Sequence, residues 1–162
     1  LFRIEVALMK GSNYSVTGAV GKVMKEAIRT AYDYLRSNIH KFTIEKSLDD
    51  LQAHFQVVNL MQAKEGSQTA SAFFVALFSA LVNKPVRPAT VVIGEITIQG
   101  GVLPVRELAE CVQLAKENGA RRVLIPTANA KDIPHIPPEI LAGLDLSFYS
   151  DPKDCLLKAL QD

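Results

Sequence analysis

The sequence feature that most constrains the fold is the apolar run Ala70–Val82, which directly follows a polar, glycine-containing turn, Lys64–Ser67. A helix built from this run is apolar on nearly all sides, and such a helix has to be buried. The run is too short to cross a bilayer and contains two serines. We therefore expect a central, buried helix that begins just after the turn.

Helix and strand patterns alternate along the rest of the chain. The predicted strands are Phe2–Met9, Ala53–Leu60, Ala89–Ile98, Arg122–Ile125 and Leu144–Phe148. The predicted helices are Val20–Ser37, Ala70–Val82, Glu107–Asn118 and one opened by Asp151-Pro152, while Lys10–Thr17 and Thr127–Pro138 are predicted loops. With 162 residues and no internal repeat, the pattern indicates a single α/β or α+β domain over residues 1–162, with mixed sheets and packed helices.

The composition excludes several classes of protein. Hydrophobic residues make up 48% of the chain, which excludes wholesale disorder. Basic and acidic residues number 18 and 17, so the net charge of +1 gives no reason to expect nucleic-acid or membrane binding by this domain itself. Cys111 and Cys155 have no CxxC or Cys/His partner, so we expect reduced thiols and neither a metal nor a cofactor in this domain.

The start of the chain bears on where the protein works. No signal peptide opens the sequence, and we expect a cytoplasmic protein. The first residue is Leu1 rather than an initiator methionine. We therefore expect the chain to be a piece of a longer protein.

The turn before the buried helix is where the residues alone point to chemistry. Small polar side chains and free backbone N–H groups at a helix N-terminus can form a nucleophile or an anion site. Ser67 is expected to cap the helix, its hydroxyl accepting from a backbone N–H. A nucleophilic Ser67 with a base elsewhere is the alternative, and Thr69 and Ser71 follow it. His54 has no cysteine or second histidine near it and is expected to be a surface or hydrogen-bonded residue.

Three segments, in order along the chain, resemble the C-terminal proteolytic domain of Lon proteases. Val16–Ser37 (VTGAVGKVMKEAIRTAYDYLRS) is similar to the family's helix that opens with Leu-Thr-Gly-x-x-Gly-x-Val-Met-Lys-Glu-Ser. Gly94–Val105 (GEITIQGGVLPV) is similar to Gly-Glu-Ile-Thr-Leu-x-Gly-x-Val-Leu-Pro-Ile, and Asn118–Pro126 resembles Ala-Gly-x-x-x-Val-Leu-Ile-Pro. The segments keep compatible spacing over nearly the whole chain. The resemblance implies the Lon proteolytic-domain fold.

The resemblance also implies which positions carry the family's chemistry, a dyad in which a lysine of lowered pKa takes the proton of a serine. The family places the serine in Lys-Asp-Gly-Pro-Ser-Ala-Gly, and an ungapped match to Lys64–Ala70 puts Gln68 there. It places the lysine in Leu-Pro-Ile-Gly-Gly-Leu-Lys-Glu-Lys, and the match to Leu103–Cys111 puts Ala109 there. A glutamine is no source of an alkoxide and an alanine accepts no proton, so the resemblance implies a lost dyad.

Two further positions bear on whether another group could replace the dyad. Lys116 is seven residues beyond Ala109, roughly 10 Å along a helix axis, which is too far to replace the family's lysine. Thr97 matches a threonine that lies near that lysine in the family. Without the lysine, Thr97 is expected to be a plain strand residue.

In the family this domain follows an AAA+ ATPase and helps to form a hexameric ring. The resemblance therefore implies a proteolytically inactive assembly or scaffold domain in a homo-oligomer, with ATP bound by an upstream module. Among divergent members, the chain resembles the Lon-like AAA+ factors of BREX phage-defence systems, which implies DNA as a partner through other domains and no membrane. One alternative is an active ATP-dependent serine endopeptidase that uses Ser67. The other is a domain that binds peptides or small molecules in the old cleft without cleaving them.

Overall fold

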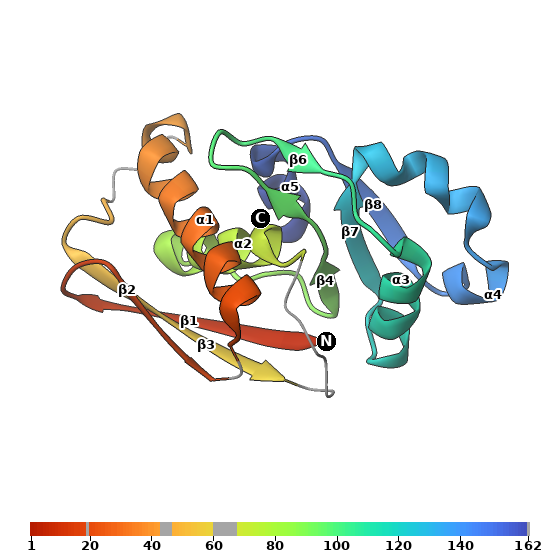
Figure 1. Ribbon diagram of the computed structural model, residues 1–162, viewed down its shortest axis with the longest axis horizontal. Coiled ribbons are helices and arrows are strands. Elements are labelled where there is room, and N and C mark those ends of the chain that lie inside the picture. Colours follow the sequence, from red (N-terminus) through yellow and green to blue (C-terminus); the bar gives the residue numbers. More distant parts are fainter. Residues whose placement is uncertain (19, 43–46, 60–67, 162) are drawn as a thin grey trace.

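The computed structural model describes residues 1–18, 20–42, 47–59 and 68–161. Its elements, shown in Figure 1, are β1 (Phe2–Lys10), β2 (Tyr14–Gly18), α1 (Lys22–Asn38), the 3-10 helix η1 (Ile39–Phe42), β3 (Leu51–Asn59), α2 (Ala70–Val82), β4 (Thr90–Val92), β5 (Glu95–Ile96), β6 (Val102–Leu103), α3 (Leu108–Glu117), β7 (Arg122–Pro126), the 3-10 helix η2 (Thr127–His135), α4 (Pro138–Leu141), β8 (Asp145–Tyr149) and α5 (Pro152–Ala159). The described strands form two three-stranded sheets and one hairpin. Mixed sheets with packed helices confirm the predicted α/β class.

The first sheet has the order β1-β3-β2, with β1 antiparallel and β2 parallel to β3. Along β1 half-buried and exposed residues alternate, as a period of two requires when one face of a sheet is covered. The prediction of a loop over Lys10–Thr17 is wrong in its second half, because β2 begins at Tyr14. Its strand forms through pairing with β3, far along the chain, and the local sequence carries no sign of that partner.

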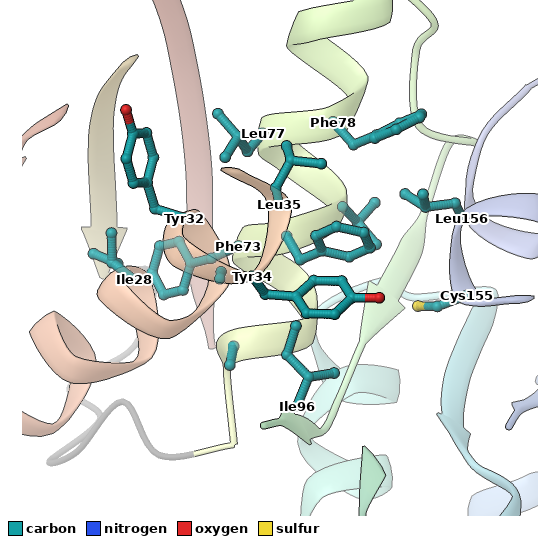
Figure 2. Packing of buried hydrophobic residues seen from close by; sticks show 14 of the residues in the cluster. Ile28, Tyr32, Tyr34, Leu35, Phe73, Leu77, Phe78, Ile96, Cys155 and Leu156 are labelled. Atoms are coloured by element: carbon teal, nitrogen blue, oxygen red, sulfur yellow. The ribbon is translucent and has the colours of Figure 1, made fainter. Parts of the chain in front are cut away.

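The helix α2 has the predicted bounds and lies at the centre of the larger hydrophobic core. Phe73, Phe74, Leu77 and Leu81 are each fully buried. Figure 2 shows side chains of α1 on one side of α2 and the side chains of Cys155 and Leu156, from α5, on the other. The apolar side chains on nearly all sides of α2 are thus covered by side chains of the elements around it.

The second sheet has the order β4-β7-β8 and is parallel throughout. Successive residues of the central strand β7 point into different cores, since Val123 and Ile125 pack with α3 while Leu124 joins the larger core. A strand covered on both faces reads as a continuous apolar run. The edge strand β4 is only half-buried.

The predicted strand Ala89–Ile98 is two strands in different sheets, because the chain turns at Gly94. The φ angle of Gly94 is +142°, and a Cβ there would lie 2.0 Å from the hydroxyl oxygen of Tyr149. After the turn, β5 pairs with β6 in an antiparallel hairpin, and β6 is labelled close to α5 in Figure 1. The prediction of one strand is therefore wrong, and the contact with Tyr149 explains why residue 94 is a glycine.

The predicted loop Thr127–Pro138 is wrong over most of its length, because the 3-10 helix η2 occupies Thr127–His135. The start of α5 confirms the sequence-based expectation. Asp151 caps α5, and its carboxylate accepts the N–H of Asp154 at 2.7 Å. Pro152 occupies the first helical position, where its missing N–H costs nothing. Within the described residues, none of the helices is both long enough and apolar enough to cross a membrane.

Candidate functional site

The site lies where the chain enters α2, at Gln68. This residue has a left-handed backbone, with a φ of 62°. Its N–H donates to Oε1 of Glu95 at 3.1 Å, and its carbonyl accepts the N–H of Gly94 at 3.0 Å. The start of α2 is thereby tied to the turn between β4 and β5. The N-cap residue of α2 is Thr69, and the expected cap by the Ser67 hydroxyl stays a prediction. Ser67 itself lies outside the described residues.

The side chain of Gln68 is bonded to the backbone of Arg106. The carboxamide Nε2 donates to the Arg106 carbonyl at 3.2 Å, and the Arg106 N–H donates to Oε1 at 2.5 Å. One carboxamide thus satisfies both backbone polar groups of one residue. The guanidinium of Arg106 also lies 3.7 Å from Glu95, whose carboxylate already accepts the Gln68 N–H.

The thiol of Cys111 completes the group of side chains around Gln68. Its sulfur lies 3.9 Å from Gln68 Nε2 and 3.9 Å from the carbonyl of Arg106. Burial, followed by the carboxylates of Glu107 and Glu110, raises the pKa of this thiol. Cys111 is therefore a neutral thiol at neutral pH rather than a thiolate nucleophile. It is half-buried and reduced.

Two further sequence-predicted candidates, Ala109 and Lys116, have other recorded neighbours. Ala109 is half-buried and packs into the smaller hydrophobic core. Lys116 donates from Nζ to the carbonyl of Glu139 in α4 at 2.6 Å. In the part of the chain that the structure describes, the side chain of Gln68 is bonded to Arg106 and Cys111.

Ser71 and Thr97 have structural partners. The hydroxyl of Tyr149 donates to the carbonyl of Ile93 at 2.7 Å and lies 2.9 Å from Oγ of Ser71, which is 1% exposed. Thr97 was expected in a strand, yet it follows β5 and its Oγ1 accepts the Gly101 N–H at 2.9 Å. The side chain of Thr97 thus closes the hairpin turn.

His54 is a hydrogen-bonded histidine, as expected. Its Nε2 lies 2.9 Å from Oγ1 of Thr17 in the neighbouring strand β2. Among the described residues, no group of three or more His, Cys, Asp or Glu side chains is placed to hold a metal ion.

Asn129 is the residue that sequence reasoning missed. Its carboxamide accepts the N–H of Val105 at 2.8 Å and donates to the Val105 carbonyl at 3.0 Å, and its side chain is fully buried. Nδ2 also donates to Asp132 at 2.9 Å. The available signal was its position just after β7, at the carboxyl edge of a parallel sheet, where functional side chains gather.

A cavity of about 570 Å³ opens beside Gln68 and Cys111. The edge strands of both three-stranded sheets contribute to its wall, and so do α2 and α3. Its lining includes Phe2 and Ile4 from β1, Val91 from β4, Ala72 and Val75 from α2, and Leu114 from α3. The geometry therefore provides a largely apolar hollow with a carboxamide and a thiol at its wall.

The family-model comparison and the fold agree on one family. All residues from 1 to 162 match the model of the Lon protease (S16) C-terminal proteolytic domain. The chain belongs to this family. It is 39% identical over 162 residues to the Lon-like protease BrxL of Escherichia coli O9:H4 (strain HS), covering 99% of this chain and 23% of that protein.

Two further relatives are a Lon-like protease and a Lon protease. It is 32% identical to the Lon-like protease BrxL of Bacillus cereus (strain H3081.97), over 98% of this chain and 24% of the relative. It is 33% identical to Lon protease 2 of Desulfotalea psychrophila (strain LSv54 / DSM 12343), over 99% of this chain and 21% of the relative. The chain thus spans about a quarter of the length of the curated relatives it matches.

Proposed function

We propose that this chain is the C-terminal domain of a longer Lon-like protein, and that it serves assembly rather than peptide-bond cleavage. One observation carries the proposal. The side chain at the position that corresponds to the family's nucleophile is a carboxamide, and both of its polar atoms are bonded to the backbone of Arg106. A serine nucleophile needs a hydroxyl whose proton a neighbouring base removes. Gln68 offers no such hydroxyl.

The base half of the dyad supports the same proposal. Ala109, at the lysine position, has a methyl side chain, and Lys116 is bonded to a carbonyl of α4. Cys111, whose sulfur lies 3.9 Å from the Gln68 carboxamide, has a raised pKa and stays protonated at neutral pH. Removing one member of a catalytic unit already removes most of the rate, so the loss of two argues against the family's mechanism.

The other parts of the proposal concern the full-length protein. We infer that ATP binds in an upstream module, that this domain contributes to a hexameric ring, and that the ring works in the cytoplasm. The resemblance to the Lon-like factors of BREX systems supports a role in phage defence, in which we infer that DNA is contacted by other domains. The balanced charge of this domain agrees with that division of labour.

Proteolysis is tested on the full-length protein with a fluorophosphonate serine probe and with fluorescently labelled, unfolded casein plus ATP. The expected result is neither labelling nor cleavage, while an active Lon protease assayed alongside gives both. The Ser67→Ala variant is measured in parallel. Labelling or cleavage that disappears in Ser67→Ala would establish the alternative, a serine endopeptidase with a displaced nucleophile.

Assembly is tested by light scattering and native mass spectrometry of the full-length protein and of a truncated form that ends before Leu1. The full-length protein is expected to form a closed ring, and the truncated form to dissociate at the same concentration. A ring that survives the truncation would show that other domains hold it together, and the assembly role would be wrong.

A further inference from the structure

Two carboxamides from different parts of the fold hold the segment between β6 and α3. Asn129, which follows β7, bonds to the N–H and the carbonyl of Val105. Gln68, which precedes α2, bonds to the N–H and the carbonyl of Arg106. These bonds lie outside the sheets and helices, so side chains rather than a strand ladder satisfy the backbone polar groups of the segment.

The two holds differ in their exposure to water. Asn129 is fully buried and also donates to Asp132, so its bonds to Val105 belong to the interior. Gln68 is half-buried and Arg106 is exposed, so water competes for the bonds between them. The bonds of Gln68 are therefore the ones that can open while the rest of the domain stays folded.

Gln68 also connects the two hydrophobic cores. It lies two residues before α2, whose side chains fill the larger core, while Arg106 lies between Val105 and Leu108 of the smaller core. Glu95 completes the connection, since its carboxylate accepts the Gln68 N–H at 3.1 Å and lies 3.7 Å from the Arg106 guanidinium. Gln68, Glu95 and Arg106 thus form a clasp between the cores.

The carboxamide is the part of this clasp that matters most. The side chain of Arg106 is 67% exposed, and an ion pair so open to solvent stabilises a fold very little. The two bonds of the Gln68 carboxamide reach the backbone of Arg106, and each removes one polar group from competition with water. The clasp therefore depends on the side chain of Gln68 and only weakly on the side chain of Arg106.

The clasp closes over the thiol of Cys111 in the first turn of α3. The Cys111 sulfur lies 3.9 Å from Gln68 Nε2 and 3.9 Å from the Arg106 carbonyl, so both partners of the clasp touch it. Burial is the main cause of the raised pKa of this thiol. Opening of the clasp therefore increases both access to the sulfur and the fraction present as thiolate.

We propose that the Gln68 carboxamide is a latch that holds Arg106 and the first turn of α3 against the start of α2. Its release exposes the Cys111 thiol, while Asn129 keeps Val105 in place. The position that corresponds to the family's nucleophile thus carries a conformational lock in this chain. The latch concerns local opening, and it is independent of whether the domain assembles or cleaves.

The test compares the full-length native protein with Gln68→Gly. Glycine suits the φ of 62° at this position, so the main-chain bonds to Glu95 and Gly94 remain. Alkylation of Cys111 by N-ethylmaleimide, followed by peptide mass spectrometry, is expected to be about tenfold faster in the variant, as the loss of about one hydrogen bond predicts.

Hydrogen exchange, resolved to single amides by fragmentation, locates the opening. In Gln68→Gly the Arg106 amide is expected to exchange about tenfold faster, while the Val105 amide, bonded to Asn129, keeps its native rate. Gln68→Ala should match Gln68→Gly in both measurements, which assigns the effect to the lost carboxamide rather than to glycine.

Two matched variants test which part of the clasp acts. Arg106→Ala removes the ion pair but keeps the backbone groups that Gln68 holds, and it should change Cys111 alkylation by less than about twofold. Gln113→Ala removes an exposed amide elsewhere on α3, which donates to Glu117 at 3.1 Å, and should behave like the native protein.

Cys155, which is 1% exposed, reports opening of the whole domain in the same experiment. Its alkylation is expected to stay slow in every variant. The proposal would be overturned by unchanged Cys111 alkylation in Gln68→Gly, by an equal increase in Arg106→Ala, or by an equal increase at Cys155, which would mean global unfolding.

Discussion

At the scale of single residues, the entry to α2 depends on one glycine as much as on Gln68. Gly94 donates its N–H to the Gln68 carbonyl, and its own carbonyl accepts the N–H of Ser71 at 3.2 Å. The turn after β4 is therefore hydrogen-bonded both to the residue before α2 and to the first turn of α2. The hydroxyl of Tyr149 occupies the space where a side chain at this position would begin. The identity of residue 94 is thus set by its backbone angle and by Tyr149 together.

Gly94→Ala is expected to lower the free energy of unfolding by about 3 kcal/mol, the sum of an unfavourable backbone conformation and overpacking against Tyr149. Urea denaturation followed by circular dichroism measures the loss. Gly119→Ala is the matched control, because Gly119 also has a positive φ, of 89°, but nothing lies within 4 Å of its would-be Cβ. If both substitutions cost the same, contact with Tyr149 does not matter and the steric argument fails.

At the scale of elements, α2 organises the larger core. Phe73 stacks edge-on against Phe55 of β3 with ring centroids 6.0 Å apart, and Phe74 packs in the same manner on Tyr34 of α1 at 5.3 Å. Such tilted ring pairs add to the gain from burial. The side chains of α2 therefore pack against the first sheet, α1 and α5 within a single hydrophobic core.

Leu77→Ala is expected to destabilise the protein by about 3 kcal/mol, because Leu77 is fully buried in α2 and the cavity left behind has few ways to collapse. Leu157→Ala makes the same chemical change on α5, where the leucine is 67% exposed, and should alter stability by less than about 0.5 kcal/mol. Thermal and urea denaturation of both variants measure the difference. Similar losses at the two positions would contradict the central burial of α2.

At the scale of the whole molecule, the second sheet is enclosed between two cores. Tyr149 and Cys155 lie in the larger core, with 0% and 1% of their surfaces exposed. Burial raises the pKa of Cys155 from 9.0 to about 12, and burial also raises the pKa of Tyr149. Both groups are therefore neutral in the fold at any physiological pH, and their ionisation opposes folding.

Stability is expected to fall in alkaline solution. The unfolded chain releases the Cys155 proton near pH 9 and the folded chain only near pH 12, so the stabilisation is complete below pH 9 and is lost as the pH rises between these values, by up to about 4 kcal/mol. Urea denaturation at a series of pH values measures the slope. Cys155→Ala should show a shallower decline over the same range, with the remainder due to the other groups whose pKa is raised by burial, among them Tyr149 and Cys111. An unchanged slope in Cys155→Ala would show that this thiol is not protected by the core.

Much of the architecture was predictable because it is encoded locally. The all-apolar surface of Ala70–Val82 determines a buried helix with the observed bounds, and Asp151 with Pro152 determines the start of α5. The family motifs predict Gln68 and Ala109 at the dyad positions. These features depend on residue type and spacing within one segment, and a sequence displays both directly.

Only the tertiary structure shows which strands pair and which side chains bond to which backbone groups. β2 pairs with β3, and the segment predicted as one strand over Ala89–Ile98 turns at Gly94, where the Tyr149 hydroxyl leaves no room for a side chain. The pairing of Gln68 with Arg106, like that of Asn129 with Val105, joins positions 38 and 24 residues apart. A carboxamide can bond to any free backbone group, so its chemistry does not specify a partner. Folding specifies it, by bringing one particular N–H and carbonyl within reach.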